Sequence, residues 1–309
     1  MILSVAIPLL NEEAVLPELL RRLIAVLDGT EGGPHEMVFV DDGSCDATPM
    51  LLADAVARDA RVRVVRLSRS FGHQSAISAA LDHVRGDVVL VMDGDLQDEP
   101  EQIPRFLAAL AGGYDVVYAT RTTRAESWPL RLAYRLFYRL FARLSRVPIP
   151  LDAGDFALLT RRVVVAMRSA PERNRFLRGL RAWVGFRQIG IPVDRASRQG
   201  GASKYSFVAL CRLALDGVFA FSTVPIRAAM VAGALAIGVA VLFAIYAVYA
   251  RLILGHSPAG FTSIIVAITF LSGVNLFFLG IIGEYVGRMY EETKQRPLYI
   301  VEDVMERGS

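Results

Sequence analysis

Two long runs without charged residues lie in the C-terminal third of the chain, and they limit its possible folds more than any other feature. Residues 228–250 carry no charge and lie between Arg227 and Arg251. A helix of this length measures roughly 34 Å at about 1.5 Å per residue, which is enough to cross the hydrocarbon core of a bilayer. A second run, residues 261–283, follows a short loop that contains His256. We therefore expect two transmembrane helices rather than a helical hairpin buried in a soluble core.

The basic residues around these runs predict their orientation. Arg227 precedes the first run, Arg288, Lys294 and Arg296 follow the second, and the connecting loop carries Arg251 alone. Lys and Arg are enriched on the cytoplasmic side of membrane helices. The sequence thus predicts a multi-pass protein of the cytoplasmic (inner) membrane whose soluble part faces the cytoplasm.

The first 200 residues follow a different pattern. Charged residues make up 21% of the whole chain, which is too many for a pure membrane bundle. Short runs rich in Val and Ile alternate with stretches of helical periodicity, which is typical of a mainly parallel α/β sheet. We expect an α/β domain at residues 1–204, a juxtamembrane helix at 205–222, the membrane pair within 225–288 and a cytoplasmic tail at 289–309. Two cysteines are too few for a disulfide scaffold or a Cys-rich metal site.

Residues 129–147 form a basic, amphipathic segment. It contains five arginines and no acidic residue, and its large apolar side chains recur at spacings of three and four: Leu130, Tyr134, Phe137, Phe141 and Leu144. A helix with one apolar and one arginine-rich face is typical of the membrane interface, although an ordinary surface helix has the same pattern. Beside two membrane spans, we favour an interfacial helix.

A pair of carboxylates closes one of the strand-like runs, at the place where ligands of parallel sheets bind. Asp93 and Asp95 are two residues apart, and Gln97 lies two residues further. Two carboxylates and an amide oxygen suit a hard divalent cation that also binds substrate phosphates. The sequence therefore predicts a metal and phosphate site at this strand end, although an acidic turn after a strand has the same composition.

A second acidic loop follows another strand-like run. Asp41 and Asp42 end the run, and carboxylates in this position can accept hydrogen bonds from a ribose or a base. Asp46 or Thr48 in the same loop can instead cap the following helix, because their side-chain oxygens accept hydrogen bonds from exposed backbone N–H groups. The residues alone leave both roles open.

These motifs together resemble those of the family 2 glycosyltransferases. The matching segments, in order, are SVAIPLLNEE, VDDGSCDAT, RSFGHQSAISAALD and VMDGDLQDEPE. The later segments LDAGDFALLTRRVV, FLRGLRAWVGF, RQGGASKYSF and RPLYIV are similar to those of the polyprenyl-phosphate glycosyltransferases, bacterial relatives of dolichol-phosphate mannose synthase. The resemblance covers nearly the whole chain and implies a GT-A (Rossmann-like) domain followed by two membrane helices. Gly94 stands where the family more often has Ala.

The resemblance implies roles for individual residues. The nucleotide would be bound by Pro8, Asn11, Glu13, Asp41, Asp42 and Asp93, and Mg²⁺ or Mn²⁺ by Asp93, Asp95 and Gln97. The acceptor phosphate would be bound by Arg121, Arg131, Ser203 and Lys204. Asp95 and Asp155 would be the catalytic residues. Asp155 would serve as a base, a metal-associated ligand or an orienter of the sugar, and a buried partner for an arginine is the structural alternative. Likewise, Arg178 and Trp183 would either contact the sugar or pack in the core.

The function implied by the resemblance is transfer of a sugar from a nucleotide sugar to polyprenyl (undecaprenyl) phosphate, with inversion at the anomeric carbon. UDP-glucose is the favoured donor, with UDP-GlcNAc, UDP-galactose and GDP-mannose as alternatives. The product would be a membrane-bound sugar donor for the cell envelope. A homo-oligomer, such as a tetramer, is the expected assembly, and no nucleic-acid partner is expected. A non-catalytic membrane scaffold is the alternative of a different class, and its mark would be loss of the carboxylates Asp93 and Asp95, which are present here.

Overall fold

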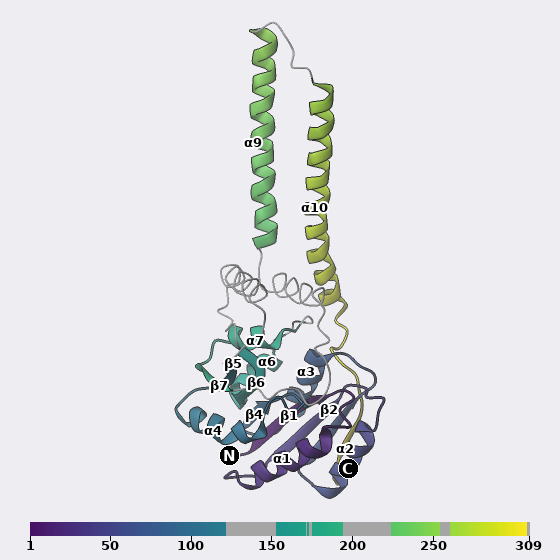
Figure 1. Ribbon diagram of the computed structural model, residues 1–309, viewed down its shortest axis with the longest axis vertical. Helices are drawn as coiled ribbons and strands as arrows, with labels where there is room; N and C mark the ends of the chain where they lie inside the picture. Colours follow the sequence, from purple (N-terminus) through teal and green to yellow (C-terminus); the bar gives the residue numbers. More distant parts are fainter. Residues whose placement is uncertain (122–152, 171, 173–174, 194–223, 254–259, 308–309) are drawn as a thin grey trace. The chain divides into compact units, whose positions relative to one another are not determined.

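A computed structural model describes the chain except for residues 122–152, 171, 173–174, 194–223, 254–259 and 308–309 (Figure 1). The chain forms two compact units. The first comprises Met1–Ala142, Val147–Phe207 and Arg296–Ser309, and the second comprises Arg143–Arg146 and Val208–Gln295. The expected helices at 129–147 and 205–222 lie outside the described residues.

The first unit is built on a mixed, mainly parallel sheet. In the described part of the chain it has eight strands in the order β7-β5-β6-β4-β1-β2-β3-β8. The neighbours β4, β1, β2 and β3 are parallel, as are β5 and β7, whereas β6 and β8 run antiparallel to their neighbours. The strands are β1 (Leu3–Leu9), β2 (Glu36–Asp41), β3 (Val62–Leu67), β4 (Val88–Val91), β5 (Val116–Arg121), β6 (Ala153–Thr160), β7 (Gln188–Val193) and β8 (Val301–Glu306). This confirms the expected α/β class with a mainly parallel sheet.

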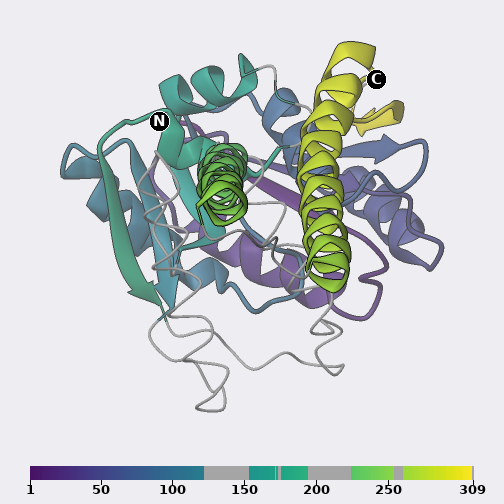
Figure 2. The same ribbon diagram turned by 90° about the horizontal axis from the view of Figure 1, so that it is seen from above.

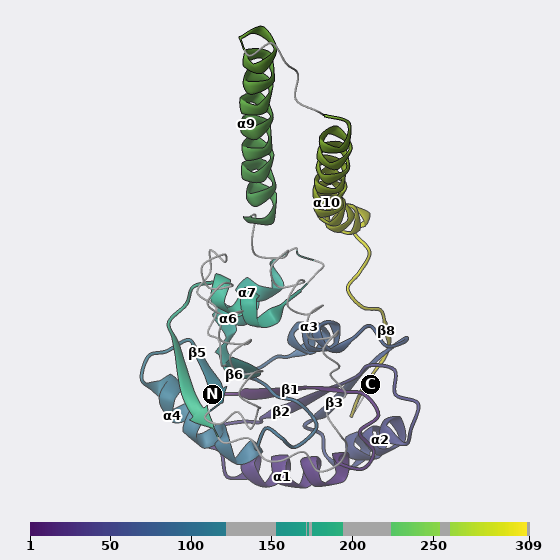
Figure 3. The same ribbon diagram turned by 45° about the horizontal axis from the view of Figure 1, so that its top comes forward.

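Helices cover both faces of the sheet, so the central strands are mostly apolar on both faces (Figure 3). One face packs against α1 (Leu16–Asp28), α2 (Thr48–Arg58) and α4 (Ile103–Ala111), which begins directly after the short helix η1 (Pro100–Gln102). The other face packs against α3 (His73–His83), α6 (Arg161–Arg168) and α7 (Leu177–Trp183).

The alternation of side chains along β1 shows how the two cores arise. Val5, Ile7 and Leu9 belong to the core beneath α1, whereas Ala6 points into the core beneath α3. The buried residues of α1 lie three or four positions apart, at Leu16, Leu19, Leu23 and Leu27, so they form one helical face. Strand and helix periodicity in the sequence therefore account for both layers.

The C-terminal strand β8 completes the sheet by pairing antiparallel with β3 (Figure 2). The backbone N–H of Ser68 donates to the Ile300 carbonyl at 3.0 Å just before the strand begins. Within the strand, Asp303 lies opposite Arg66. The sequence analysis predicts a cytoplasmic tail over these residues but no strand, because a single edge strand of six residues carries little local signal.

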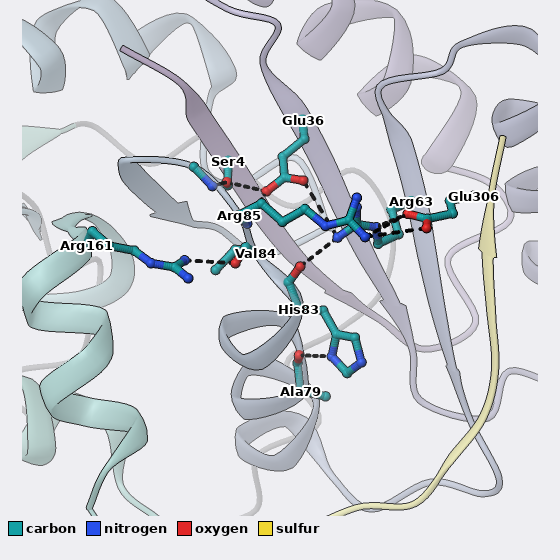
Figure 4. Close-up of polar contacts among 10 residues, drawn as sticks. Ser4, Glu36, Arg63, Ala79, His83, Val84, Arg85, Arg161 and Glu306 are labelled. Carbon is teal, nitrogen blue, oxygen red and sulfur yellow. Dashed lines mark hydrogen bonds and ion pairs between the residues drawn. The ribbon is translucent and has the colours of Figure 1, made fainter. Parts of the chain in front are cut away.

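Ion pairs fix β8 to the sheet (Figure 4). The Nε atom of Arg63 in β3 donates to Glu306 at 2.8 Å, and Nη1 of the same guanidinium donates to the His83 carbonyl at 2.8 Å. Arg85 adds a second cation 3.2 Å from Glu306, and Glu36 lies 3.8 Å from Arg63. Arg63 is only 7% exposed, so its charge depends on these partners.

The second unit contains the helices α9 (Val224–Leu252) and α10 (Phe261–Lys294), which contact each other. Among the described residues, one segment, Phe270–Lys294, is long and apolar enough to cross a membrane, and the apolar stretch Val231–Tyr246 of α9 is shorter. The prediction of two membrane spans, at 228–250 and 261–283, is thus confirmed only in part.

The helix α10 extends beyond the predicted membrane span at 261–283. It continues through a charged segment, in which Arg288 donates to Glu284 at 2.9 Å and Lys294 to Glu291 at 2.7 Å. Ion pairs at spacings of three and four support a helix, so α10 does not end where the apolar run ends.

Candidate active site

The carboxyl ends of three neighbouring parallel strands meet at one edge of the sheet. In the register of β1 and β2, Leu9 lies opposite Asp41, and β4 pairs with the other side of β1. The loop after β1 carries Asn11, the loop after β2 carries Asp42, and the loop after β4 carries Asp93 and Asp95. The predicted clusters of polar residues therefore share one edge, which is where ligands of such sheets bind.

Asp41 is a buried carboxylate at this edge, with 1% of its surface exposed. Its Oδ1 atom accepts a hydrogen bond from the Ser44 backbone N–H at 2.9 Å. Its Oδ2 atom accepts no hydrogen bond from the described residues, and Nε of Arg66 lies 3.9 Å away. A buried carboxylate oxygen without a donor is unfavourable, so a ligand N–H or O–H group would be bound there with a net gain.

Asn11 and Glu13 join the loops that follow β1 and β2. Oδ1 of Asn11 accepts a hydrogen bond from the Cys45 N–H at 2.8 Å, and Oε2 of Glu13 accepts one from the Ala47 N–H at 2.8 Å. Asn11 is in the left-handed region, with a φ of 55°, which its short polar side chain tolerates. These two side chains thus hold the two loops together, and Pro8 lies in β1 opposite Val40.

Asp42 fixes the loop that leads into α3. Its carboxylate accepts hydrogen bonds from the Ser70 hydroxyl at 2.8 Å, the Phe71 N–H at 2.7 Å and the Gly72 N–H at 3.0 Å. The same loop passes so close to Gly43 that a Cβ atom there would lie 2.7 Å from the Ser70 nitrogen. Asp42 therefore orients the start of α3, and with it His73, and its contact with the nucleotide stays a prediction.

The loop after β4 presents the predicted metal ligands. Oδ1 of Asp95 accepts a hydrogen bond from the Gln97 N–H at 3.1 Å, and Leu96 between them has a φ of 56°. A Cβ atom on Gly94 would overlap with the end of the Leu9 side chain, so an alanine here would require that side chain to shift.

The donor set of this loop fits a hard cation that arrives with phosphate. Within the described residues there is no group of three or more His, Cys, Asp or Glu side chains arranged to hold a metal. Mg²⁺ usually needs no such group, because it is held by one or two carboxylates together with substrate phosphates and water. The carboxylates of Asp93 and Asp95 meet that requirement.

Asp155 reaches the same edge from the antiparallel strand β6. Val91 of β4 lies opposite Ala157, so Asp93 and Asp155, two residues further in opposite directions, come together. The Nε and Nη2 atoms of Arg178 in α7 donate to the two Asp155 oxygens at 2.8 Å each.

His73 lies between the two carboxylates. Its Nε2 atom is 3.5 Å from Asp93 and 3.6 Å from Asp155. Asp93 and Asp155, together with Arg178, line a pocket at the ends of β4 to β7, whose other lining residues are Asp98, Ala119, Thr120, Gly154, Phe156 and Val193. His73 lies beside this pocket through its contacts with the two carboxylates, so anionic and cationic groups meet here.

The charges in this pocket stabilise one another. Burial alone would favour a neutral Asp155, but the hydrogen bonds from Arg178 and His73 outweigh it and hold the pKa of Asp155 well below its usual range. Burial likewise opposes a charge on His73, yet its contacts with Asp155 and Asp93 raise the pKa of the imidazole. Nearby, burial lowers the pKa of Arg181 to about 10. That guanidinium donates to the Gly154 carbonyl at 3.2 Å and lies 4.8 Å from the Tyr118 ring centroid.

The predicted acceptor-phosphate residues are largely outside the described residues. This applies to Arg131, Ser203 and Lys204, whereas Arg121 is the last residue of β5 and lies opposite Val193. The pairing of Asp155 with Arg178 agrees with the alternative that Asp155 is a buried partner for an arginine, whereas the sequence analysis did not predict which arginine it is or that His73 contacts the same carboxylate. His73 and Arg178 lie in two of the segments that resemble the family, RSFGHQSAISAALD and FLRGLRAWVGF. The spacing of these segments in the sequence does not show that they meet in the fold.

Comparison with known proteins places the chain among glycosyltransferases. The model of the family "Glycosyl transferase family 2" matches residues 4–167. An uncharacterised glycosyltransferase of Synechocystis sp. is 41% identical over 98% of this chain and 95% of its own length. The bactoprenol glucosyl transferase of Shigella phage SfV is 36% identical over 97% of this chain and 98% of its own length. Among solved structures, glucosyl-3-phosphoglycerate synthase from Mycobacterium tuberculosis, in complex with Mn²⁺, UDP-glucose and phosphoglyceric acid, aligns with a TM-score of 0.46 at 22% identity, over 71% of this chain and 78% of that chain.

Proposed function

The chain belongs to glycosyl transferase family 2, and on that premise we propose that it transfers glucose from UDP-glucose to polyprenyl (undecaprenyl) phosphate. The observation that carries this proposal is the similarity to a bactoprenol glucosyl transferase over 97% of the chain, which includes the apolar helices as well as the sheet. A likeness confined to the α/β unit would support only sugar transfer. The product would be a membrane-bound sugar donor for cell-envelope glycosylation.

The donor would bind at the edge formed by β1, β2 and β4. The Oδ2 atom of Asp41 would accept a hydrogen bond from the ribose or the base, because it is buried and accepts none from the described residues. Asp93, Asp95 and Gln97 would hold Mg²⁺ or Mn²⁺ on the diphosphate, and that ion would neutralise the charge that develops on the leaving group.

The acceptor would need binding more than activation. A phosphate monoester has a second pKa near 6, so the lipid phosphate is mostly ionised at cytoplasmic pH. The difficult step is to bring this anion close to the anionic donor, and planar arginine side chains bind phosphate in a two-point contact. We assign this role to Arg121 and Arg131, with Ser203 and Lys204 beside the phosphates. Direct displacement of the nucleotide would invert the anomeric carbon and produce a β-linked sugar from an α-linked donor.

In this mechanism Asp155 orients its neighbours rather than removing a proton. Both of its oxygens accept hydrogen bonds from Arg178, and the ionised acceptor needs no base. Asp155 would thus fix the guanidinium of Arg178 beside Asp93, at the side of the pocket where the phosphates would lie.

We further propose that α9 and α10 both cross the membrane. The strands β3 and β8 belong to one sheet, and the two helices lie between them in the chain. A chain that leaves a sheet on one side of a membrane and returns to it crosses the membrane an even number of times. If α10 spans the bilayer, a second crossing is needed, which we assign to α9, and the basic residues at both ends favour a sheet on the cytoplasmic side. The family resemblance also supports a homo-oligomer, for which a tetramer is the expected form.

The test is transfer by the purified, full-length protein in lipid nanodiscs. Undecaprenyl phosphate is incubated with labelled UDP-glucose, UDP-GlcNAc, UDP-galactose or GDP-mannose, and the lipid fraction is analysed. We expect a lipid-linked glucose from UDP-glucose that is sensitive to mild acid. A different labelled sugar in the lipid would change the donor, and no lipid-linked sugar from any donor would support the scaffold alternative.

The metal assignment is tested in the same assay. Asp95→Asn removes one carboxylate from the ion, so turnover should fall by about two orders of magnitude or more while the protein still folds. EDTA should abolish transfer by the wild-type protein, and added Mg²⁺ or Mn²⁺ should restore it. The exposed Asp303→Asn variant is the control for loss of a negative charge. Full transfer in EDTA would remove the metal from the mechanism.

A further inference from the structure

An ionic link connects the C-terminal strand with the donor site. Arg66 in β3 lies directly opposite Asp41 in the register of β2 and β3. Its Nε atom is 3.2 Å from Glu302 in β8 and 3.9 Å from Oδ2 of Asp41. One guanidinium thus lies within reach of two carboxylates, one in the C-terminal strand and one in the donor site.

Glu302 keeps a defined place because β8 is fixed on both sides of it. On one side, Glu306 pairs with Arg63 and Arg85 (Figure 4). On the other, the hydroxyl of Tyr299 donates to Asp82 in α3 at 2.7 Å. The position of the Glu302 carboxylate relative to β3 is therefore set by contacts that do not involve Arg66.

The distribution of exposure favours the pair with Glu302 over the pair with Asp41. The side chains of Arg66 and Glu302 are 44% and 52% exposed, whereas Asp41 is almost fully buried. Moving Arg66 fully onto Asp41 would take its charge partly out of water and away from Glu302, and both changes are unfavourable; removal of the Glu302 charge eliminates the second of them. The nearer partner therefore holds the guanidinium at the surface.

We propose that Glu302 is a positioning residue for the donor site: it holds Arg66 away from Asp41 and thereby leaves the buried Oδ2 atom open to the nucleotide. The inference rests on the proposed function, in which Asp41 contacts the nucleotide. It gives the C-terminal strand, which follows the membrane helices in the chain, a direct effect on donor binding.

The proposal predicts opposite effects for two neutralising variants. In Glu302→Gln, Arg66 loses its closer partner and pairs with Asp41, so it competes with the nucleotide, and UDP binding should weaken about two- to fivefold, the range of an exposed ion pair. In Arg66→Met no competitor is present, so UDP binding should equal or exceed that of the wild type. In the double variant Glu302→Gln/Arg66→Met, removal of Glu302 should have no further effect.

The experiment is calorimetric titration of UDP with full-length protein in detergent, together with transfer kinetics. For Glu302→Gln the Michaelis constant for UDP-glucose should rise by the same factor, while kcat at saturating donor and the Michaelis constant for undecaprenyl phosphate stay unchanged. Asp303→Asn, the neighbouring acid of β8, is the matched control and should bind UDP like the wild type. A merely structural role of Glu302 would lower the melting temperature without this selective effect on the donor.

Two results would overturn the inference while leaving the donor site intact. One is UDP binding by Glu302→Gln that equals that of Asp303→Asn. The other is weaker UDP binding by Arg66→Met than by the wild type, which would make Arg66 a nucleotide contact. A wild-type protein that does not bind UDP would instead overturn the proposed donor site, and this role of Glu302 with it.

Discussion

The two-point contact between Arg178 and Asp155 determines what each residue can do. A carboxylate whose two oxygens both accept charged hydrogen bonds is held in one orientation and stays ionised. His73 touches the same carboxylate and that of Asp93, so three segments far apart in the sequence fix the side of the pocket next to the predicted metal ligands. The reactivity of the pocket therefore depends on orientation more than on a single proton-accepting group.

Arg178→Lys tests this role of orientation. Lysine keeps the charge but presents it as a point, so it cannot bind both Asp155 oxygens in the plane of the carboxylate. We expect kcat to fall about ten- to a hundredfold, the cost of roughly 1.5–3 kcal/mol for a charged hydrogen bond. UDP binding should change by less than about twofold.

The matched control for this variant is Arg175→Lys. Arg175 lies three residues away and donates to the carbonyls of Ala170 and Glu172 rather than to the pocket, so its variant should retain turnover. The measurements are transfer rates at saturating substrates and calorimetric titration of UDP. Loss of UDP affinity as large as the loss of turnover would assign Arg178 to the donor and contradict the role described here.

Site residues that stand at the end of an apolar strand can be predicted from the sequence. Contacts between side chains from distant parts of the chain cannot. Asp41, Asp93 and Asp95 close apolar strand-like runs, and the parallel pairing of β4, β1 and β2 brings them to one edge. His73 and Asp155 are separated by 81 intervening residues, and their contact depends on β6 running antiparallel to β4. Local periodicity carries no information about that direction.

Among the secondary-structure elements, β8 differs most from its sequence pattern. Its six residues include three acids, and it is a strand because it pairs with β3. The helices α1 and α10 are the opposite case, because regular spacing of apolar side chains or a long apolar run predicts them without tertiary contacts. The sheet order could thus be predicted in its parallel centre but not at its C-terminal edge.

Glu306→Gln tests how strongly β8 depends on its ionic contacts. The variant leaves the buried Arg63 guanidinium with the His83 carbonyl and the more distant Glu36 as its nearest partners. We expect the unit that contains the sheet to lose about 1–3 kcal/mol of stability, which would lower its melting temperature by several degrees.

Thermal unfolding followed by tryptophan fluorescence, together with limited proteolysis of the C-terminal tail, measures this effect. Asp303→Asn changes an exposed acid of the same strand and should melt like the wild type. If Glu306→Gln melts at the wild-type temperature and resists proteolysis equally, the ion pairs of Figure 4 do not hold the strand in place.

For the whole molecule, the return of the chain to its sheet is the feature with the widest consequences. The first unit is not contiguous in sequence, because β8 is separated from β7 by Val208–Gln295, the larger segment of the second unit. A soluble protein can insert a helical pair in this way without restriction. In a membrane, the same connectivity requires an even number of crossings, so the path of the chain determines the topology of the helices.

This requirement predicts the side of the membrane on which the loop between α9 and α10 lies. In a variant with Cys45 and Cys211 replaced by serine, Ser257→Cys should react with a membrane-impermeant thiol reagent added to intact spheroplasts. Ser309→Cys should react only after lysis, because the C-terminus should remain with the sheet in the cytoplasm. Labelling of both positions from outside would mean an odd number of crossings, which is incompatible with pairing of β3 and β8 within one chain. Protection of both until lysis would mean that neither helix crosses, and the apolar segment Phe270–Lys294 would then have to lie on the membrane rather than through it.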